Sequence, residues 1–364
     1  MDNMKFLLVI SLLISNIVFA KDIILYPKFE TEPVFTSGDA ADDPAFWYNQ
    51  VNPEQSIVFG TDKKAGIHAF ALNGARIKFI PSGKINNIDI RKDFKFGAKA
   101  FSIMMGSNQD NNSIIAYLIN DQGDFDTYNQ NEIFTELDSV YGFCLYRSPK
   151  TNFTYAFISD AKSLTINQYH ILSIFPLKGS LVRQIKTQST SEGCVADDET
   201  GILYFAQEDE HSGVYFINAD PNTKNNDIGK IDLISKKGGF INGDTEGLAI
   251  LRYEENKLLF ASSQSSDDFT VYDLNNRNKF IGRVSVGKKN EIDGISKTDG
   301  IEIFSGKINQ DFKYGILIAQ DDMNMEKFNL KEKEIQATKV NQNFKIVSID
   351  LSLIHISEPT RQLC

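Results

Sequence analysis

Short apolar segments rich in β-branched and aromatic residues alternate with polar turns along most of the chain. Such segments fit pleated, half-buried strands, and pairs such as Asn73-Gly74 are typical of the turns between them. Strands are predicted at Ser56–Thr61, Ile67–Leu72, Phe101–Gly106, Ser113–Ile119, Tyr141–Tyr146, Tyr155–Ser159, Gly201–Ala206, Gly213–Asn218, Gly247–Arg252, Lys257–Ser262, Phe269–Leu274, Phe280–Val286, Gly300–Phe304 and Tyr314–Ala319. We see no long amphipathic helix. The pattern predicts an all-β protein, either a sandwich, a barrel or a propeller.

A weak repeat runs through the second half of the chain. An acidic residue followed by glycine leads into an apolar strand at Glu192-Gly193, at Glu246-Gly247 and at Asp299-Gly300. The three copies are about fifty residues apart, a plausible period for the blades of a propeller. Because no Pro- or Ser-rich linker divides the chain, we expect a single domain over residues 21–353.

The two ends of the chain differ from the rest. Residues 1–20 carry Lys5, an apolar run over Phe6–Val18 and a small residue at Ala20, the pattern of a cleaved signal peptide. The run is short for a membrane-spanning helix, so we expect a secreted or periplasmic protein with no membrane attachment after cleavage. Residues 354–364 show no strand pattern, and we expect this tail to lie outside the fold.

Composition narrows the functional classes. Asp and Glu total 48 against 38 Lys and Arg, a formal net charge of −10. This balance argues against nucleic acid as a partner, which requires a basic face. The cysteines Cys144 and Cys194 lie within apolar strand-like runs, so we predict buried free thiols and no disulfide framework.

Acidic residues gather at the ends of predicted strands. Asp39, Asp42 and Asp43 fall within five residues, a costly arrangement unless a positive charge lies among them. Alone, a solvated acidic turn is the simpler interpretation. The theme recurs, however, at Asp89, Glu192, Glu208, Glu246 and Asp299. Because hard oxygen ligands suit Ca²⁺, the whole set favours bound cations on one axial face of a propeller.

A second set of residues suits a phosphorylated ligand. Lysine binds phosphate as a point charge and tyrosine donates a hydrogen bond to it, although any one lysine is more often a plain surface residue. The candidates are Lys63, Lys64, Arg91, Tyr141 and Lys162. The sequence lacks the signatures of histidine acid phosphatases, cysteine phosphatases, α/β-hydrolases and Walker-type nucleotidases.

The order and spacing of these motifs resemble β-propeller phytases from about residue 30 to about residue 350. The motifs are Gly38–Ala45, Thr61–Gly66, Asn86–Arg91, Val140–Phe143, Ser191–Gly193, Ala196–Glu199, Glu208–Glu210, Asp244–Leu248, Ala261–Gln264, Thr298–Ile301, Ala319–Asp321 and Asn341–Lys345. The resemblance implies a six-bladed β-propeller, several calcium ions, and a monomer that hydrolyses phosphomonoesters of myo-inositol hexakisphosphate through direct attack of a calcium-activated water.

The resemblance also implies roles for individual residues. The implied metal ligands are Asp42, Asp43, Asp89, Glu192, Glu208, Glu246 and Asp299. The implied catalytic groups are Glu192, Glu208, Tyr141 and Lys162, and the implied substrate contacts are Lys63, Lys64, Arg91 and Gln109.

Two positions depart from the pattern of this family. Gln109 stands where the family usually has Arg, and Ser163 stands where it usually has Glu. The loss of a guanidinium removes a bidentate phosphate contact. Two alternatives therefore stay open: a non-catalytic propeller that binds inositol phosphates, and a calcium-dependent phosphoesterase with another substrate.

Overall fold

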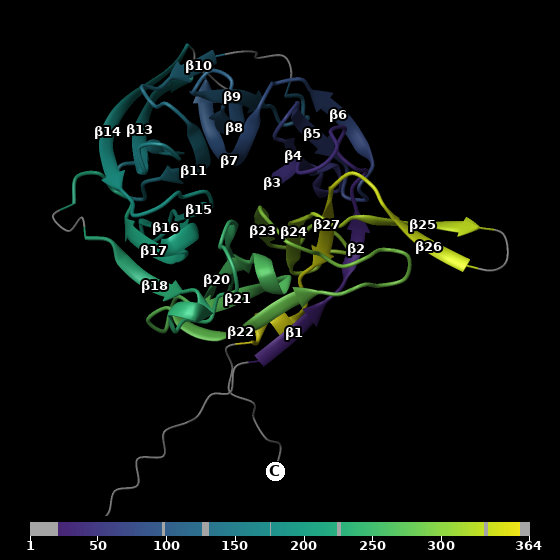
Figure 1. The fold of residues 1–364 in the computed structure, drawn as a ribbon. Coiled ribbons are helices and arrows are strands. Elements are labelled where there is room, and N and C mark those ends of the chain that lie inside the picture. The colour runs from purple at the N-terminus through teal and green to yellow at the C-terminus, as the bar shows by residue number, and fades with distance from the viewer. Residues whose placement is uncertain are drawn as a thin grey trace, which may run out of the picture.

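The computed structural model describes residues 21–96, 99–125, 131–174, 176–223, 227–330 and 334–356. In this part of the chain, six small antiparallel sheets stand in a ring around a central axis (Figure 1). The all-β class and the six-bladed propeller implied by the resemblance are confirmed. The predicted signal peptide lies outside the described residues. No helix among the described residues is long and apolar enough to cross a membrane.

The first three blades follow one another along the chain, each as a four-stranded meander from the axis outward. Blade 1 contains β3 (Ala41–Trp47), β4 (Ile57–Asp62), β5 (Gly66–Phe70) and β6 (Arg76–Ile80). Blade 2 contains β7 (Ile85–Phe96), β8 (Lys99–Asn108), β9 (Ser113–Ile119) and β10 (Asn131–Phe134). Blade 3 contains β11 (Val140–Arg147), β12 (Thr154–Asp160), β13 (Thr165–Ile174) and β14 (Leu177–Lys186).

The last three blades complete the ring. Blade 4 contains β15 (Cys194–Asp197), β16 (Ile202–Gln207), β17 (Gly213–Asn218) and β18 (Gly229–Leu233). Blade 5 contains β19 (Leu248–Tyr253), β20 (Asn256–Ser263), β21 (Asp268–Asp273) and β22 (Lys279–Val286). Blade 6 contains β23 (Ile301–Ser305), β24 (Gly315–Asp321) and β27 (Asn343–Ser348), with the hairpin of β25 (Met325–Leu330) and β26 (Glu334–Lys339) inserted before β27.

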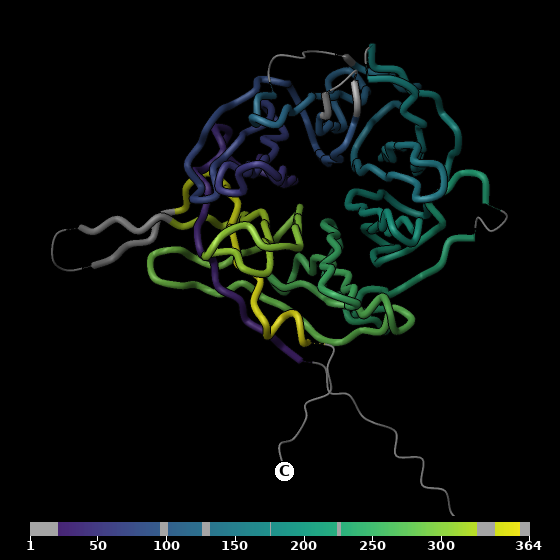
Figure 2. The backbone as a smooth tube through the Cα atoms, turned by 180° about the vertical axis from the view of Figure 1, so that it is seen from behind, coloured from purple at the N-terminus to yellow at the C-terminus, as the bar shows by residue number. Residues whose placement is uncertain are grey.

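The N-terminal strands close the ring. β2 (Pro27–Glu30) pairs antiparallel with β27 and becomes the outer strand of blade 6. β1 (Lys21–Leu25) pairs in parallel with β22 at the outer edge of blade 5. Figure 2 shows the N-terminal segment beside the C-terminal one from behind. The first described residues thus cover the edges of the last two sheets, which would otherwise expose unpaired backbone groups.

Apolar side chains fill the space between neighbouring blades. Middle strands such as β9 and β12 are buried at every position, as expected for strands packed on both faces. Ile103 and Met105 of blade 2, for example, pack in one cluster with Phe143 and Leu145 of blade 3. Burial of this kind, worth about 25 cal/mol per Å² of apolar surface, fixes the blades against one another.

The prediction of free thiols is wrong. Cys144 of β11 and Cys194 of β15 form a disulfide between the inner strands of blades 3 and 4, with Cα atoms 5.8 Å apart. The two cysteines are 50 residues apart in sequence, and only the ring arrangement of the blades brings them together.

One short helix follows the last strand. The helix α1 (Leu351–Ile354) begins at Asp350, whose carboxylate accepts hydrogen bonds from the backbone of Ser352 and Leu353. Ile354 and Ile356 are buried against the core between blades 5 and 6, so these two residues, which the sequence assigned to the tail, pack with the propeller. Residues 357–364 lie outside the described part, and the domain boundary stays a prediction.

Candidate active site

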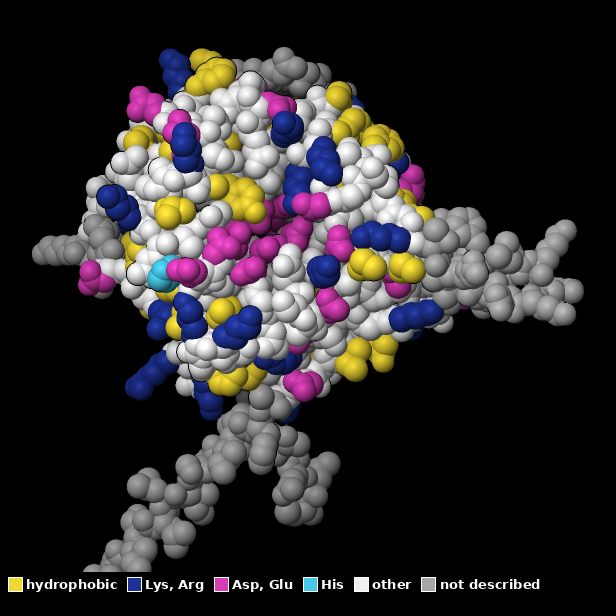
Figure 3. All heavy atoms as spheres, in the orientation of Figure 1, with side chains coloured by type: hydrophobic (Ala, Val, Ile, Leu, Met, Phe, Trp, Pro, Cys, Tyr) yellow, Lys and Arg dark blue, Asp and Glu magenta, His cyan; other side chains and the backbone are white. Residues whose placement is uncertain are grey.

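Acidic side chains gather in a hollow at the centre of one face of the ring (Figure 3). A repeat in which the site residue is followed by glycine explains how these side chains come together. Tyr141, Glu192, Glu246 and Asp299 each precede a glycine at the start of an inner strand. A Cβ atom on Gly193 would overlap the carbonyl group of Glu246, and one on Gly142 would overlap that of Glu192. Glycine therefore lets each blade approach the backbone of the next site residue, which draws the side chains together.

Lys63 lies within the carboxylates of blades 1 and 6. It follows β4, and its Nζ lies 2.8 Å from Asp39 Oδ1, 2.9 Å from Asp42 Oδ2 and 3.8 Å from Asp299 Oδ2. Asp42 is 1% exposed. Burial opposes the charge of Lys63, but the nearby Asp42 and Asp299 raise its pKa, so the ammonium group stays charged.

Glu192 is held at both carboxylate oxygens. Asn86 Nδ2 donates to Oε1 at 2.5 Å, and the Tyr141 hydroxyl donates to Oε2 at 2.9 Å. Asn86 in turn accepts a 3.3 Å hydrogen bond from Gln109 Nε2. The three-blade network fixes the orientation of Glu192, which is only 4% exposed.

Gln264 joins two further carboxylates. Its Nε2 donates to Glu246 Oε2 at 3.0 Å and to Asp299 Oδ1 at 3.1 Å. Glu208 lies at the end of β16, and its buried Oε1 has no hydrogen-bond partner among the described residues. Both carboxylate oxygens of Asp42 also lack a hydrogen-bond partner among the described residues. Oδ2 forms the ion pair with Lys63.

Burial first, and then the repulsion between neighbouring carboxylates, raises the pKa values of these groups. Burial and the neighbouring Asp299 raise the pKa of Asp42 to about 6, against the pull of Lys63. Burial, Asp209 and Asp244 raise the pKa of Glu208 to about 8. Burial and Asp299 raise the pKa of Glu246 to about 11. Burial, Asp42 and Glu208 raise the pKa of Glu192 well above its usual value. The cluster has more carboxylates than its own cations can neutralise.

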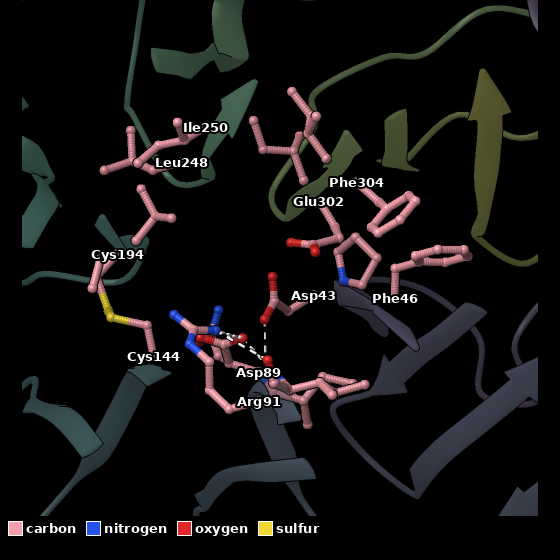
Figure 4. Close-up of a pocket in the computed structure, with 18 of the residues that line it drawn as sticks. Asp43, Phe46, Asp89, Arg91, Cys144, Cys194, Leu248, Ile250, Glu302 and Phe304 are labelled. Carbon is pink, nitrogen blue, oxygen red and sulfur yellow. Dashed lines mark hydrogen bonds and ion pairs between the residues drawn. A yellow bond between two sulfur atoms is a disulfide. The ribbon is translucent and has the colours of Figure 1, made fainter. Parts of the chain in front are cut away.

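A second group of predicted residues lines the central channel instead. Asp43, Asp89 and Arg91 border a cavity of about 470 Å³ together with Glu302 (Figure 4). Asp43 accepts a 2.9 Å hydrogen bond from the backbone of Ile88. It turns away from Asp42 because successive side chains on a strand point to opposite sides.

Arg91 is engaged within the protein. Its guanidinium lies 2.7 Å from Asp89 Oδ1 and 2.8 Å from Asp198 Oδ2, and it also donates to the carbonyl oxygen of Leu145. Asp89 accepts a further hydrogen bond from the backbone of Leu145. The structure thus does not bring Arg91 or Asp89 into the acidic hollow.

Two predicted lysines lie outside the cluster as well. Lys162 is exposed and its Nζ lies 2.8 Å from Asp138 Oδ2. Lys64 donates to the carbonyl oxygen of Ser37 at 2.9 Å. Both side chains are exposed, and the ion pair of Lys162 can open toward a ligand because an exposed ion pair contributes little to stability.

Three residues of this region were not among the predicted site residues. Asn86 and Gln264 are the amides that orient Glu192, Glu246 and Asp299, and Glu302 lines the channel. Asn86 and Gln264 occur within the motifs of the resemblance, which was the available signal; Asn86 lies in β7 and Gln264 directly follows β20. Glu302 lies within β23 and carries no such signal, although burial and Asp89 raise its pKa to about 8.

The comparisons with known proteins agree with this geometry. The family described as Phytase matches residues 6–359. The chain belongs to the phytase family. The 3-phytase of Bacillus subtilis (strain 168) is 35% identical over 338 residues, which covers 90% of this chain and 84% of that protein.

Solved structures give weaker similarities to this phytase-family chain. A functionally unknown protein from Desulfotomaculum acetoxidans DSM 771 has a TM-score of 0.43 at 17% identity and covers 66% of this chain and 70% of its own. Hydrazine synthase from Kuenenia stuttgartiensis has a TM-score of 0.47 at 10% identity and covers 84% of this chain and 98% of its own. Similarities at this level carry no argument about function.

The carboxylates of this phytase-family site are suitable ligands for a hard cation, but their side chains are not already placed to coordinate one. The described residues hold no group of three or more His, Cys, Asp or Glu side chains already placed to coordinate a metal ion. Asp42 Oδ1 and Glu208 Oε1 are nevertheless buried carboxylate oxygens with no hydrogen-bond partner among the described residues. Oxygen atoms of this kind are the ligands that calcium prefers.

Proposed function

We propose that the protein is a secreted, calcium-dependent phytase that hydrolyses phosphomonoesters of myo-inositol hexakisphosphate. The observation that carries the proposal is the set of carboxylates in the acidic hollow, two of which, Asp42 and Asp299, lie beside Lys63, in a chain of the phytase family. The 3-phytase relative supports the substrate class. We propose in addition that residues 1–20 are a signal peptide, that the mature chain is a monomeric single domain, and that it acts in the periplasm or outside the cell.

The calcium ions would be held by Asp42, Glu192, Glu208, Glu246 and Asp299. When bound there, calcium neutralises phosphate oxygens and lowers the pKa of water. Asp43, which faces the channel, and Asp89, which is paired with Arg91, are proposed as ligands only of a separate channel position.

The residues of the chain supply the positioning. Lys63 is a fixed cation at the edge of the hollow and can bind a phosphate oxygen that enters it. Burial and Glu192 raise the pKa of Tyr141, so its hydroxyl keeps its proton and remains a hydrogen-bond donor. Asn86 and Gln264 hold the carboxylates in one orientation, which lowers the cost of assembling the site when substrate arrives. Lys64 and Lys162 would contact outlying phosphates after leaving their present partners.

The direct test measures phosphate release from myo-inositol hexakisphosphate by the mature chain, with millimolar calcium and with excess chelator. We expect release that requires calcium and that falls at least a hundredfold in Glu246→Gln, which keeps the shape of the side chain but cannot ionise to bind calcium. The exposed Glu54→Gln is the matched control and should keep full activity. Release that persists in chelator would exclude calcium dependence, and no release from folded protein would exclude the phytase reaction.

A different phosphate ester is the second candidate, and the Gln109 contact favours it. Gln109 donates its side-chain hydrogen bond to Asn86 and not to a phosphate group. The hydroxyl groups of Ser163 and Thr165 are hydrogen-bonded to each other. Gln109→Arg should raise activity on the hexakisphosphate by about tenfold if a guanidinium contact is what the site lacks. Gln109→Lys is the control for added charge alone. An unchanged rate in both variants, with a higher rate on another phosphomonoester, would favour the second candidate.

A further inference from the structure

A buried amide joins blade 6 to blade 1. Gln342 directly precedes β27 and is 2% exposed. Its Oε1 accepts hydrogen bonds from the backbone N–H groups of Ala40 and Ala41, at 2.6 and 2.8 Å. Its Nε2 donates to Oδ1 of Asp322, the residue after β24, at 2.6 Å. The amide thus ties two segments of blade 6 to the first residues of blade 1.

The backbone that Gln342 holds leads directly into Asp42. The carboxylate of Asp42 has no hydrogen-bond partner among the described residues, and its Oδ2 has only the ion pair with Lys63. The position of Asp42 therefore depends on the backbone that carries it. Ala40 and Ala41 are fully buried. A buried N–H group without an acceptor is costly, so this backbone is constrained to stay against Gln342.

Lys63 is held by the same backbone. Its N–H group donates to the carbonyl oxygen of Ala40 at 2.7 Å. Ala40 is therefore bonded to Gln342 through its N–H group and to Lys63 through its carbonyl group. Lys63 Nζ in turn lies 2.8 Å from Asp39 Oδ1 and 2.9 Å from Asp42 Oδ2. A displacement of Ala40 would move the lysine relative to both of its carboxylate partners.

We propose that Gln342 is a positioning residue of the active site, which places Asp42 and Lys63 through the backbone of Ala40 and Ala41. Glutamine suits this role because one side chain accepts hydrogen bonds at its oxygen and donates them at its nitrogen. The part of Asp42 and Lys63 in binding calcium and phosphate rests on the function proposed above. The transmission of position from Gln342 to Lys63 does not depend on that function.

A matched pair of variants separates positioning from stability. Gln342→Met keeps a side chain of similar length and removes the hydrogen bonds to Ala40, Ala41 and Asp322. The control is Gln168→Met in β13, the third strand of blade 3 counted outward from the axis.

Gln168 is also fully buried and hydrogen-bonded at both ends of its amide. It donates to the carbonyl oxygen of Ala219 at 2.7 Å and accepts from Arg183 Nε at 2.9 Å. Because both substitutions remove buried hydrogen bonds of the same kind, we expect similar falls in melting temperature from the two variants.

Amide hydrogen exchange in chelator, resolved by NMR, tests the transmission without substrate or calcium. In Gln342→Met, exchange should accelerate at Ala40 and Ala41, which lose their acceptor. It should also accelerate at least about tenfold at the N–H group of Lys63, whose own acceptor is the Ala40 carbonyl. Gln168→Met should leave these three rates within about twofold of the natural ones. An unchanged rate at Lys63 in Gln342→Met would overturn the proposal.

Calcium binding and kinetics then test the effect on the site. In Gln342→Met, calcium affinity by isothermal titration calorimetry and kcat/KM on myo-inositol hexakisphosphate should each fall at least about tenfold. Gln168→Met should retain both. Natural values of both in Gln342→Met would make Gln342 a structural residue only and overturn the proposal. If the natural chain neither binds calcium nor releases phosphate, the proposed phytase function fails, and the exchange rates still decide whether Gln342 positions Lys63.

A reciprocal pair keeps the test decisive if Gln342→Met does not fold. Gln342→Glu retains an acceptor for Ala40 and Ala41 but places a second carboxylate against Asp322, so exchange at Lys63 should accelerate. Gln342→Glu/Asp322→Asn exchanges the donor with the acceptor and keeps the net charge. It should return the exchange rate of Lys63 to within about threefold of the natural rate. A folded double variant that exchanges as fast as Gln342→Glu would refute the role of this contact.

Discussion

Lys345→Met should destabilise the propeller more than the loss of any surface lysine. Lys345 lies in β27, is fully buried, and its Nζ lies 2.6 Å from Glu30 Oε2, 2.5 Å from Asp293 Oδ1 and 3.2 Å from Asp321 Oδ2. These carboxylates come from the N-terminal strand β2, from the segment between blades 5 and 6, and from β24. One ammonium group thus ties together the two ends of the ring.

The magnitude follows from burial. Removal of one partner of a buried ion pair costs about 3–5 kcal/mol, because the other charge stays buried without compensation. Here Asp321 is 1% exposed, and two more carboxylates lose the same partner. At the roughly 2 °C per kcal/mol typical of larger domains, the melting temperature should fall by about 6–10 °C. The matched control is Lys28→Met in β2, whose exposed ion pair with Asp311 should contribute about 0–1 kcal/mol.

The pH dependence gives a second test of the same reasoning. Burial raises the pKa of Asp321 to about 6 even with Lys345 beside it. Without the ammonium group this pKa rises further, so the variant loses stability as pH increases and regains it when the carboxyl is protonated. Urea unfolding in chelator at pH 5 and pH 8 should therefore show the larger difference from the natural chain at pH 8. Equal unfolding free energies for the Lys345 and Lys28 variants at pH 8 would refute the argument.

Three further outcomes are expected. Reduction of the Cys144–Cys194 disulfide, which closes a loop of 50 residues, should lower the free energy of unfolding by about 4 kcal/mol in urea, and equal midpoints with and without reductant would contradict this. Gly193→Ala should lower phosphate release about 100-fold by displacing the backbone of Glu246, whereas Gly287→Ala, whose Cβ meets only side chains of Ile24 and Tyr26, should retain activity. In chelator the chain should lose stability between pH 5 and pH 8, because Asp42 and Glu208 have folded-state pKa values of about 6 and 8, above their usual range, so folding disfavours their ionisation. Calcium should remove that slope, and a flat slope in chelator would count against mutual repulsion in the cluster.

Strands at the centre of each blade could be predicted because a strand that is buried on both faces consists mostly of consecutive apolar residues. The runs Ser113–Ile119 and Gly213–Asn218 coincide with β9 and β17 at both ends. Outer strands carry less signal. β14, for instance, exposes many of its residues and forms a strand because β13 offers it a paired edge, which only the tertiary structure provides.

The sequence predicted which charged residues belong to the site, but not which of them lie in the acidic hollow and which in the channel. Asp42 and Asp43 are neighbours in sequence and received the same role. A shift of register between Ala41 and Pro44 in the pairing of β3 with β4, together with strand alternation, places one in the acidic hollow and the other in the channel. Likewise Arg91 carries a charge suited to phosphate, yet Asp89 and Asp198 neutralise it. The local sequence shows which charged side chains are present, whereas the distances between blades decide which of them are paired within the protein.

The arrangement of charge resolves how an acidic chain can act on a polyanion under the proposed function. The carboxylates that would repel phosphate are concentrated at the axis, where burial and the repulsion between them raise their pKa values. Divalent cations bound there would convert the most repulsive region into the most attractive one. Calcium removal should then abolish binding of the polyanion at the axis, because the carboxylates would again repel its phosphate groups.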